Sequence, residues 1–152
     1  MDRRLFLRAP LGAGALAAGV GLLAPLRVIA EWPAPLFEQT SAESLLRALL
    51  GDARPAPAGE VRLNTPDIAE NGATVQVGVE TTLAGVESIS LVIPKNPRPL
   101  IAMFEVDRHF AGYVETRVKM AESSEVIALV QTPEGPFTGT ARVKVTKGGC
   151  GG

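Results

Sequence analysis

The stretch VQVGVE at residues 75–80 decides the fold class of this chain. Its valines occupy every second position and alternate with Gln76, Gly78 and Glu80. Because successive side chains of a β-strand point to opposite faces, this spacing places the three valines on one face. Valine is also β-branched and favours extended backbone. The stretch therefore predicts a strand with one buried and one solvent-facing side.

Similar segments recur on both sides of this strand, at spacings near ten residues. They lie at residues 61–64, 86–93, 101–107, 113–120, 124–131 and 137–146. Turn signals separate them, including Asn71-Gly72 and the proline-rich loop PKNPRP at residues 94–99. About seven short alternating strands predict an all-β fold, an immunoglobulin-like antiparallel β-sandwich. The paired cysteines of antibody domains are absent, so this likeness concerns architecture alone.

One short helix is predicted before the sandwich. Residues 31–39 contain two prolines and are expected to form an extended lead-in. Thr40 and Glu43 have the spacing of a capping box, and Gly51 is a typical helix-ending residue. Between them lies an apolar stripe, expected to pack on the sandwich in preference to a second subunit: Leu45, Leu46 and Leu49. The segment DARPAPAG at residues 52–59 is predicted to be a linker.

Residues 1–30 have the pattern of an export signal. Arg3 and Arg4 precede an uncharged run, at residues 9–25, of alanine, leucine, glycine, valine and proline only. The run is too short and glycine-rich for a membrane span, and a small-residue cleavage site ends at Ala30. The segment resembles a bacterial twin-arginine (Tat) signal, which implies export of a folded protein to the periplasm.

The charge of the remaining chain excludes some partners. Residues 1–30 hold four arginines and one aspartate, so 11 basic and 15 acidic residues remain, for a net charge of −4. Nucleic-acid binding requires a basic face, so no nucleic-acid partner is expected. No polybasic or amphipathic segment predicts membrane binding once the signal is cleaved.

The only cysteine, Cys150, stands in the sequence GGCGG at residues 148–152. No internal disulfide can form, and glycines have no side chains with which to bury the thiol. We expect Thr146 or Lys147 to be the last anchored residue, which puts the Cα of Cys150 about 10 Å farther out. The pattern predicts a mobile arm that carries a covalent attachment point at Cys150 and consists otherwise of Gly148, Gly149, Gly151 and Gly152.

The sequence does not favour an enzyme. The single histidine, His109, lies in a predicted surface turn, and a thiol mounted on glycines is difficult for a fixed base to hold. One histidine and one cysteine cannot form a closed metal site without carboxylates, so neither metal nor cofactor is expected. The thiol is interpreted as a covalent attachment point for a substrate that other proteins transform.

The chain resembles a known family, SoxY. The likeness rests on GGCGG and four further features: residues 143–146 (VKVT), residues 66–72 (PDIAENG), the loop at 95–99 and the Tat-type leader. The resemblance implies a periplasmic sulfur carrier that binds thiosulfate-derived intermediates on Cys150 and forms a heterodimer with a sandwich subunit, SoxZ. It also implies partner enzymes that contain haem, manganese and, in some organisms, molybdenum.

Two other interpretations are kept. A chain ending in Gly-Gly is similar to ubiquitin-like carriers, which use a thiocarboxylate, and a structural sandwich protein could dimerise through the cysteine. The predicted organisation is a signal peptide at residues 1–30, lead-in, helix and linker at 31–59, a β-sandwich at 60–147 and the carrier arm at 148–152.

Overall fold

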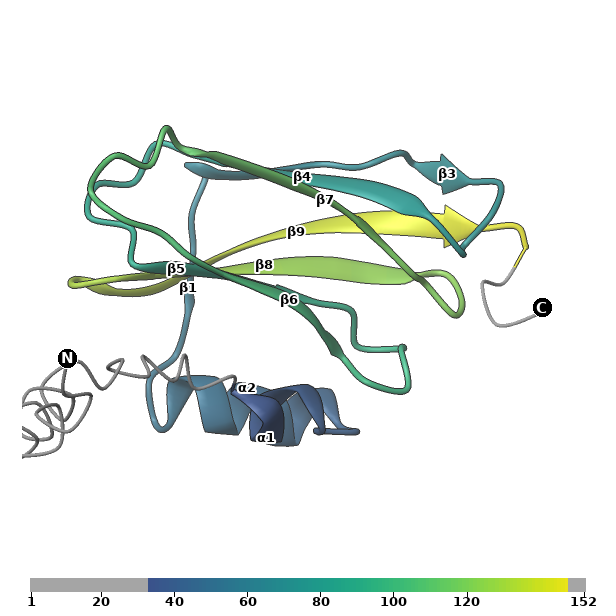
Figure 1. Ribbon diagram of the computed structural model, residues 1–152, viewed down its shortest axis with the longest axis horizontal. Helices are drawn as coiled ribbons and strands as arrows, with labels where there is room; N and C mark the ends of the chain where they lie inside the picture. The colour runs from purple at the N-terminus through teal and green to yellow at the C-terminus, as the bar shows by residue number, and fades with distance from the viewer. Residues whose placement is uncertain (1–32, 148–152) are drawn as a thin grey trace, which may run out of the picture. The chain divides into compact units, whose positions relative to one another are not determined.

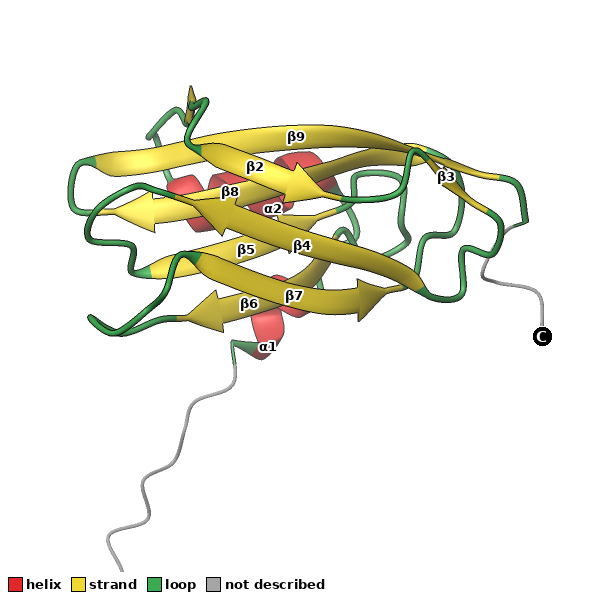
Figure 2. Cartoon of the chain, turned by 90° about the horizontal axis from the view of Figure 1, so that it is seen from above, coloured by secondary structure: helices red, strands yellow, loops and turns green. Residues whose placement is uncertain are grey.

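The structure, a computed structural model, describes residues 33–147 and consists mainly of two facing β-sheets. One sheet has the order β2 (Val61–Asn64), β4 (Val75–Thr81), β7 (Tyr113–Val118). The other has the order β1 (Ala56–Pro57), β9 (Gly135–Val145), β8 (Ser124–Thr132), β5 (Ser88–Val92), β6 (Leu100–Glu105). Figure 2 shows β2, β4 and β7 lying over β9, β8, β5 and β6. The predicted all-β, immunoglobulin-like sandwich is confirmed, with seven strands of four residues or more in the described part.

Two short strands depart from the antiparallel prediction. β1 and β3 (Ile68–Ala69) each have two residues and pair with β9 in parallel. β1 falls inside the segment predicted as a linker, residues 52–59. A pair of residues is too short to show a period of two, so no sequence pattern marks such strands.

The segment before the sandwich holds two helices, where one was predicted. The additional helix α1 (Ala34–Phe37) replaces part of the expected extended lead-in, with Pro35 in its first turn. A proline is tolerated there because the first backbone N–H groups of a helix have no intrahelical acceptor.

The second helix, α2 (Ala42–Leu50), begins one residue later than the predicted capping box requires. Its N-cap is Ser41, whose hydroxyl oxygen accepts a hydrogen bond from the Ser44 backbone N–H at 3.4 Å. Glu43 instead pairs with Arg47 one turn on, at 2.8 Å. The predicted Thr40–Glu43 capping box is therefore wrong, while Gly51, with φ of 58°, ends the helix as expected.

Helix α2 packs on the outer face of the larger sheet, as Figure 1 shows. Leu45 is fully buried there against Val92 of β5 and Leu100 of β6, with Leu49 packed at the margin. Leu46 is half-buried and lies outside this cluster. The expectation that the leucine stripe packs on the sandwich is confirmed for Leu45 and Leu49.

The main core fills the space between the two sheets. Val75, Val77 and Val79 are each at most 1% exposed and face inward, as their spacing predicts. Inward side chains of the opposite sheet complete the core, among them Ile89, Leu91, Val126, Val130 and Val143.

Gly139 of β9 lies where the two sheets approach each other closely. A Cβ added there would overlap the carbonyl oxygen of Val61 in β2 and lie 2.9 Å from the Val61 Cγ1. We expect Gly139→Ala to lower the free energy of unfolding by about 2 kcal/mol, because backbone must move to relieve the overlap. Urea unfolding of Gly139→Ala and of Gly59→Ala measures this. Gly59→Ala is the control, because no heavy atom lies within 4 Å of the added Cβ, and its free energy of unfolding should change little. Equal stability of the two variants would contradict the close approach.

Candidate functional site

The predicted attachment point and its four glycines lie outside the described residues: Gly148, Gly149, Cys150, Gly151 and Gly152. The structure does describe the residues from which this segment starts. We call residues 145–147, at the end of β9, the arm root. Its geometry fixes the point from which the predicted arm starts.

Backbone hydrogen bonds hold the arm root on the body of the sandwich. The Thr146 N–H donates to the carbonyl of Ala69 in β3 at 3.0 Å, and its hydroxyl donates to the Glu70 carbonyl at 3.2 Å. The Gly72 N–H donates to the Lys147 carbonyl at 2.8 Å. The backbone is therefore held at Thr146 and Lys147, the two residues that the sequence analysis named, and the residues after them lie outside the described part.

Three connecting segments support this attachment, and we call them together the arm platform: residues 66–73, which include β3, and the loops 94–99 and 119–123. The Gly72 carbonyl accepts from the Met120 N–H at 2.8 Å, so Gly72 bonds both to the arm root and to the next loop. The Val145 N–H donates to the Ser123 hydroxyl oxygen at 2.9 Å. The predicted turn at Asn71-Gly72 is confirmed, with the Asn71 side-chain oxygen accepting from the Ala73 N–H at 2.9 Å.

Asn96 connects two loops of the platform through a largely buried amide. It is 9% exposed; its Nδ2 donates to the Lys119 carbonyl at 2.7 Å, and its Oδ1 accepts from the Ala121 N–H at 2.9 Å. Sequence reasoning predicted only a loop here and missed this role. The available signal was an asparagine in a proline-rich loop, a residue type that often bonds to nearby backbone.

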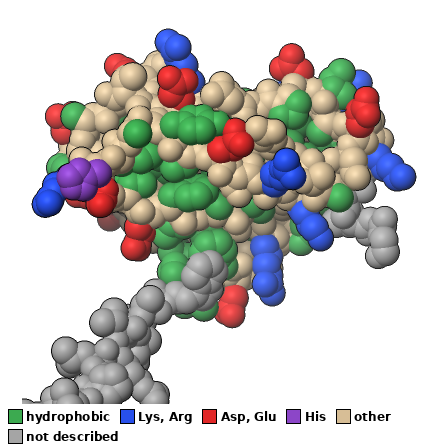
Figure 3. Space-filling view, turned by 45° about the horizontal axis from the view of Figure 1, so that its top comes forward, with side chains coloured by type: hydrophobic (Ala, Val, Ile, Leu, Met, Phe, Trp, Pro, Cys, Tyr) green, Lys and Arg blue, Asp and Glu red, His purple; other side chains and the backbone are tan. Residues whose placement is uncertain are grey.

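His109 lies far from the arm root. It is exposed in the turn between β6 and β7, where its N–H donates to the Asp107 carboxylate at 2.9 Å. That turn adjoins the Thr81 end of β4, whereas Gly72 lies just before its Val75 end. The length of β4, about 20 Å, separates the two regions. Figure 3 shows the histidine at the left, whereas β3 and the end of β9 lie at the right of Figure 1. The prediction that His109 is a surface turn residue is therefore confirmed.

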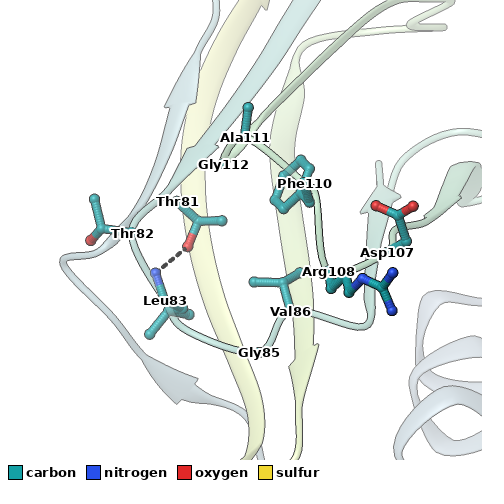
Figure 4. A pocket seen from close by; sticks show the side chains of 10 residues that line it. All are labelled: Thr81, Thr82, Leu83, Gly85, Val86, Asp107, Arg108, Phe110, Ala111 and Gly112. Carbon is teal, nitrogen blue, oxygen red and sulfur yellow. Dashed lines mark hydrogen bonds between the residues drawn. The ribbon is translucent and has the colours of Figure 1, made fainter.

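The end of the sandwich that carries His109 also has a pocket, shown in Figure 4, with a volume of about 280 Å³. The Thr81 hydroxyl oxygen accepts from the Leu83 N–H at 3.2 Å, and the charged lining residues are Asp107 and Arg108. These residues do not provide a nucleophile with a base and an orienting group. Within residues 33–147 no cluster of three histidine, cysteine or acidic side chains is placed to hold a metal ion.

Only one pair of described side chains has clearly shifted pKa values, and it does not suit acid–base catalysis. The Tyr113 hydroxyl donates to the Glu115 carboxylate at 2.5 Å, which raises the pKa of Tyr113 and lowers the pKa of Glu115. Tyrosine is thereby kept protonated and glutamate ionised at neutral pH. Neither group exchanges a proton readily in the range where a general base must work.

No helix within residues 33–147 is both long and apolar enough to span a bilayer.

Comparison with known proteins assigns the chain to a family. The family model described as sulfur oxidation protein SoxY matches residues 46–150, a range that includes Cys150. Among solved structures, the chain is similar to the sulfur carrier protein SoxY from Chlorobium limicola f thiosulfatophilum. The identity is 31% and the TM-score 0.62, over 68% of this chain and 94% of that one.

More distant matches show the fold alone. One variant of superoxide reductase (neelaredoxin) from Ignicoccus hospitalis is 16% identical with a TM-score of 0.50, over 70% of this chain and 90% of that one. A second variant is 14% identical with the same TM-score, over 69% and 92%. A search of curated proteins gave no match. With the family model matching more than half of its length, the chain belongs to the SoxY family of sulfur oxidation proteins.

Proposed function

We propose that this chain is a periplasmic sulfur carrier that binds thiosulfate-derived intermediates covalently on Cys150 and presents them to partner enzymes. One observation carries the proposal. The SoxY match extends to Cys150, and the structure anchors the chain at Lys147, three residues before that cysteine. Family membership and a fixed starting point together favour a cargo-bearing arm.

The glycines suit the arm to entering narrow clefts. Three residues beyond Lys147 extend at most about 10 Å, so Cys150 reaches a reaction centre about that far from the sandwich. Gly148, Gly149, Gly151 and Gly152 add no side-chain bulk around the thiol. The arm can therefore fit where an ordinary peptide would be excluded.

The chemistry of a thiol suits sulfur carriage. In the loading step the Cys150 thiolate and thiosulfate together lose two electrons to a haem-containing partner, and an S–S bond forms between them. Water then releases the terminal sulfonate as sulfate with two protons, which leaves a persulfide on Cys150. A manganese-dependent hydrolase is the proposed partner for this step, and a molybdenum-dependent dehydrogenase for oxidation of the persulfide sulfur.

The carrier is proposed not to be an enzyme itself. A catalytic Cys–His pair finds no support, because His109 lies about the length of β4 away from the arm root. Tyr113 stays protonated at neutral pH, and the lowered pKa of Glu115 makes its carboxylate a weak base. Haem, manganese and molybdenum are accordingly assigned to partners, with no cofactor held by this chain.

Export and assembly complete the proposal. Residues 1–30 act as a Tat signal cleaved after Ala30, and residues 31–59 and 60–147 form the lead-in and sandwich that bear the arm at 148–152. A SoxZ-like sandwich subunit binds this chain as a heterodimer. The net charge of −4 after cleavage argues against a nucleic-acid partner, and no membrane association is proposed.

Thiol trapping tests the proposal. The carrier with its partner subunit is incubated with thiosulfate and the loading enzyme alone, then treated with iodoacetamide, which alkylates a free thiol or a persulfide but not a sulfur capped as thiosulfonate. We expect alkylation of Cys150 to fall to a small fraction of its value without thiosulfate and to return after reduction with dithiothreitol. Undiminished alkylation of Cys150 after incubation with both thiosulfate and the loading enzyme would contradict covalent loading.

A further inference from the structure

Ile68 of β3 is an unusual surface residue because of its position. Within the described residues, only Ile68 and Tyr113 are large hydrophobic side chains with high exposure, at 57% and 46%. A single exposed isoleucine is ordinary in itself. This one, however, pairs with Lys144 of β9, and the next residue, Ala69, accepts the hydrogen bond from Thr146 of the arm root.

The short reach of the arm brings any partner close to Ile68. The structure fixes Lys147, and Cys150 follows after three residues, so the reacting sulfur lies within about 10 Å of the platform plus one side chain. An enzyme with its reaction centre inside a cleft must therefore bring the rim of that cleft against the arm platform. Ile68 is opposite Lys144, which lies three residues, or about 10 Å, before Lys147 along the chain.

We propose that Ile68 is the apolar anchor of a docking surface for the cleft rim of one partner, the hydrolase that releases sulfate from Cys150. This inference rests on the proposed carrier function and adds the surface that recognises this hydrolase.

The charges around Ile68 define the partner surface. Asp67 precedes Ile68 and Glu70 follows two residues on, Lys144 is its partner in β9, and Lys147 lies just beyond the end of β9. Exposed charges of both signs therefore lie near this apolar side chain. Figure 3 shows acidic, basic and apolar side chains interspersed at this end of the molecule. Protein interfaces commonly combine an apolar centre with a polar rim. The complementary enzyme rim would offer an apolar hollow bordered by polar groups of both signs.

The side chain of Ile68 can be changed without disturbing the arm root. The Lys144 N–H donates to the Asp67 carbonyl at 2.9 Å, and the Thr146 N–H to the Ala69 carbonyl at 3.0 Å. These bonds involve backbone alone, so Ile68→Ser and Ile68→Leu should leave the pairing of β3 with β9 in place.

The test compares Ile68→Ser with Tyr113→Ser, a substitution of the other exposed large hydrophobic residue, at the far end of the sandwich. Each carrier, with its partner subunit, is loaded with thiosulfate, and kcat/KM for sulfate release by the manganese-dependent hydrolase is measured against carrier concentration. Burial of the isoleucine side chain against the hydrolase stabilises the complex between carrier and enzyme. Without it, we expect kcat/KM to fall about tenfold for Ile68→Ser. Ile68→Leu should restore most of the loss, and Tyr113→Ser should stay within about twofold of the parent.

Iodoacetamide separates docking from thiol reactivity, because so small a reagent needs no docking surface. Its rate with unloaded Cys150 should be the same in all four proteins. A kcat/KM for Ile68→Ser within twofold of the parent overturns the inference, as does an equal loss for Tyr113→Ser. A parent carrier that accepts no cargo at Cys150 instead refutes the proposed function, and this inference with it.

Discussion

Replacement of Cys150 by serine is expected to abolish thiosulfate-dependent sulfate formation. A serine hydroxyl cannot form the S–S bond that holds thiosulfate or the persulfide that remains after hydrolysis. We expect the rate in the reconstituted system to fall on the order of a thousandfold or more, as when a covalent nucleophile is removed. Thermal unfolding should be unchanged, because the described hydrogen bonds that hold the arm root end at Lys147.

His109→Ala is the matched control for this prediction. It removes the only histidine, which lies in an exposed turn far from the arm root, and should leave the rate within about twofold of the parent. Substantial activity in Cys150→Ser would refute the carrier assignment. Loss of activity in His109→Ala would revive the catalytic Cys–His pair.

Leu45→Ala is expected to cause a large loss of stability. The side chain is fully buried between helix α2 and the outer face of the larger sheet, against Val92 and Leu100. Truncation removes buried methyl groups and leaves a cavity, which should lower the free energy of unfolding by about 3 kcal/mol. Urea denaturation of the chain without residues 1–30 measures the change.

The neighbouring Leu46→Ala provides the control for helix packing. Leu46 is half-buried and outside the Leu45 cluster, so we expect a loss below about 1 kcal/mol. Equal effects of the two substitutions would show that α2 does not pack on the sheet through Leu45.

The sequence was most informative where side chains follow a regular period. Val75, Val77 and Val79 predicted a buried strand face because alternation reports directly on which side faces a core. The same reasoning placed Leu45 on a packed helix face. It failed for β1 and β3, since two residues carry no period, and for α1, since a proline in the first turn of a helix resembles a proline in a loop.

The arm root shows a second limit of sequence reasoning. Its attachment depends on contacts between distant segments, such as Gly72 with Lys147 and Ser123 with Val145. Nothing local marks these partners, because the sheet topology alone brings them together. Cys150 could be proposed from sequence because its signal is compositional: a single cysteine surrounded by glycines.

The central claim is tested most directly by the mass of the mature protein from cells grown on thiosulfate. Intact mass followed by peptide mapping should show added sulfur atoms or thiosulfonate on Cys150, removable by reductant. A modification at the Gly152 carboxylate, as in a thiocarboxylate carrier, or a Cys150 found only as free thiol or as a disulfide between two copies, would contradict the account.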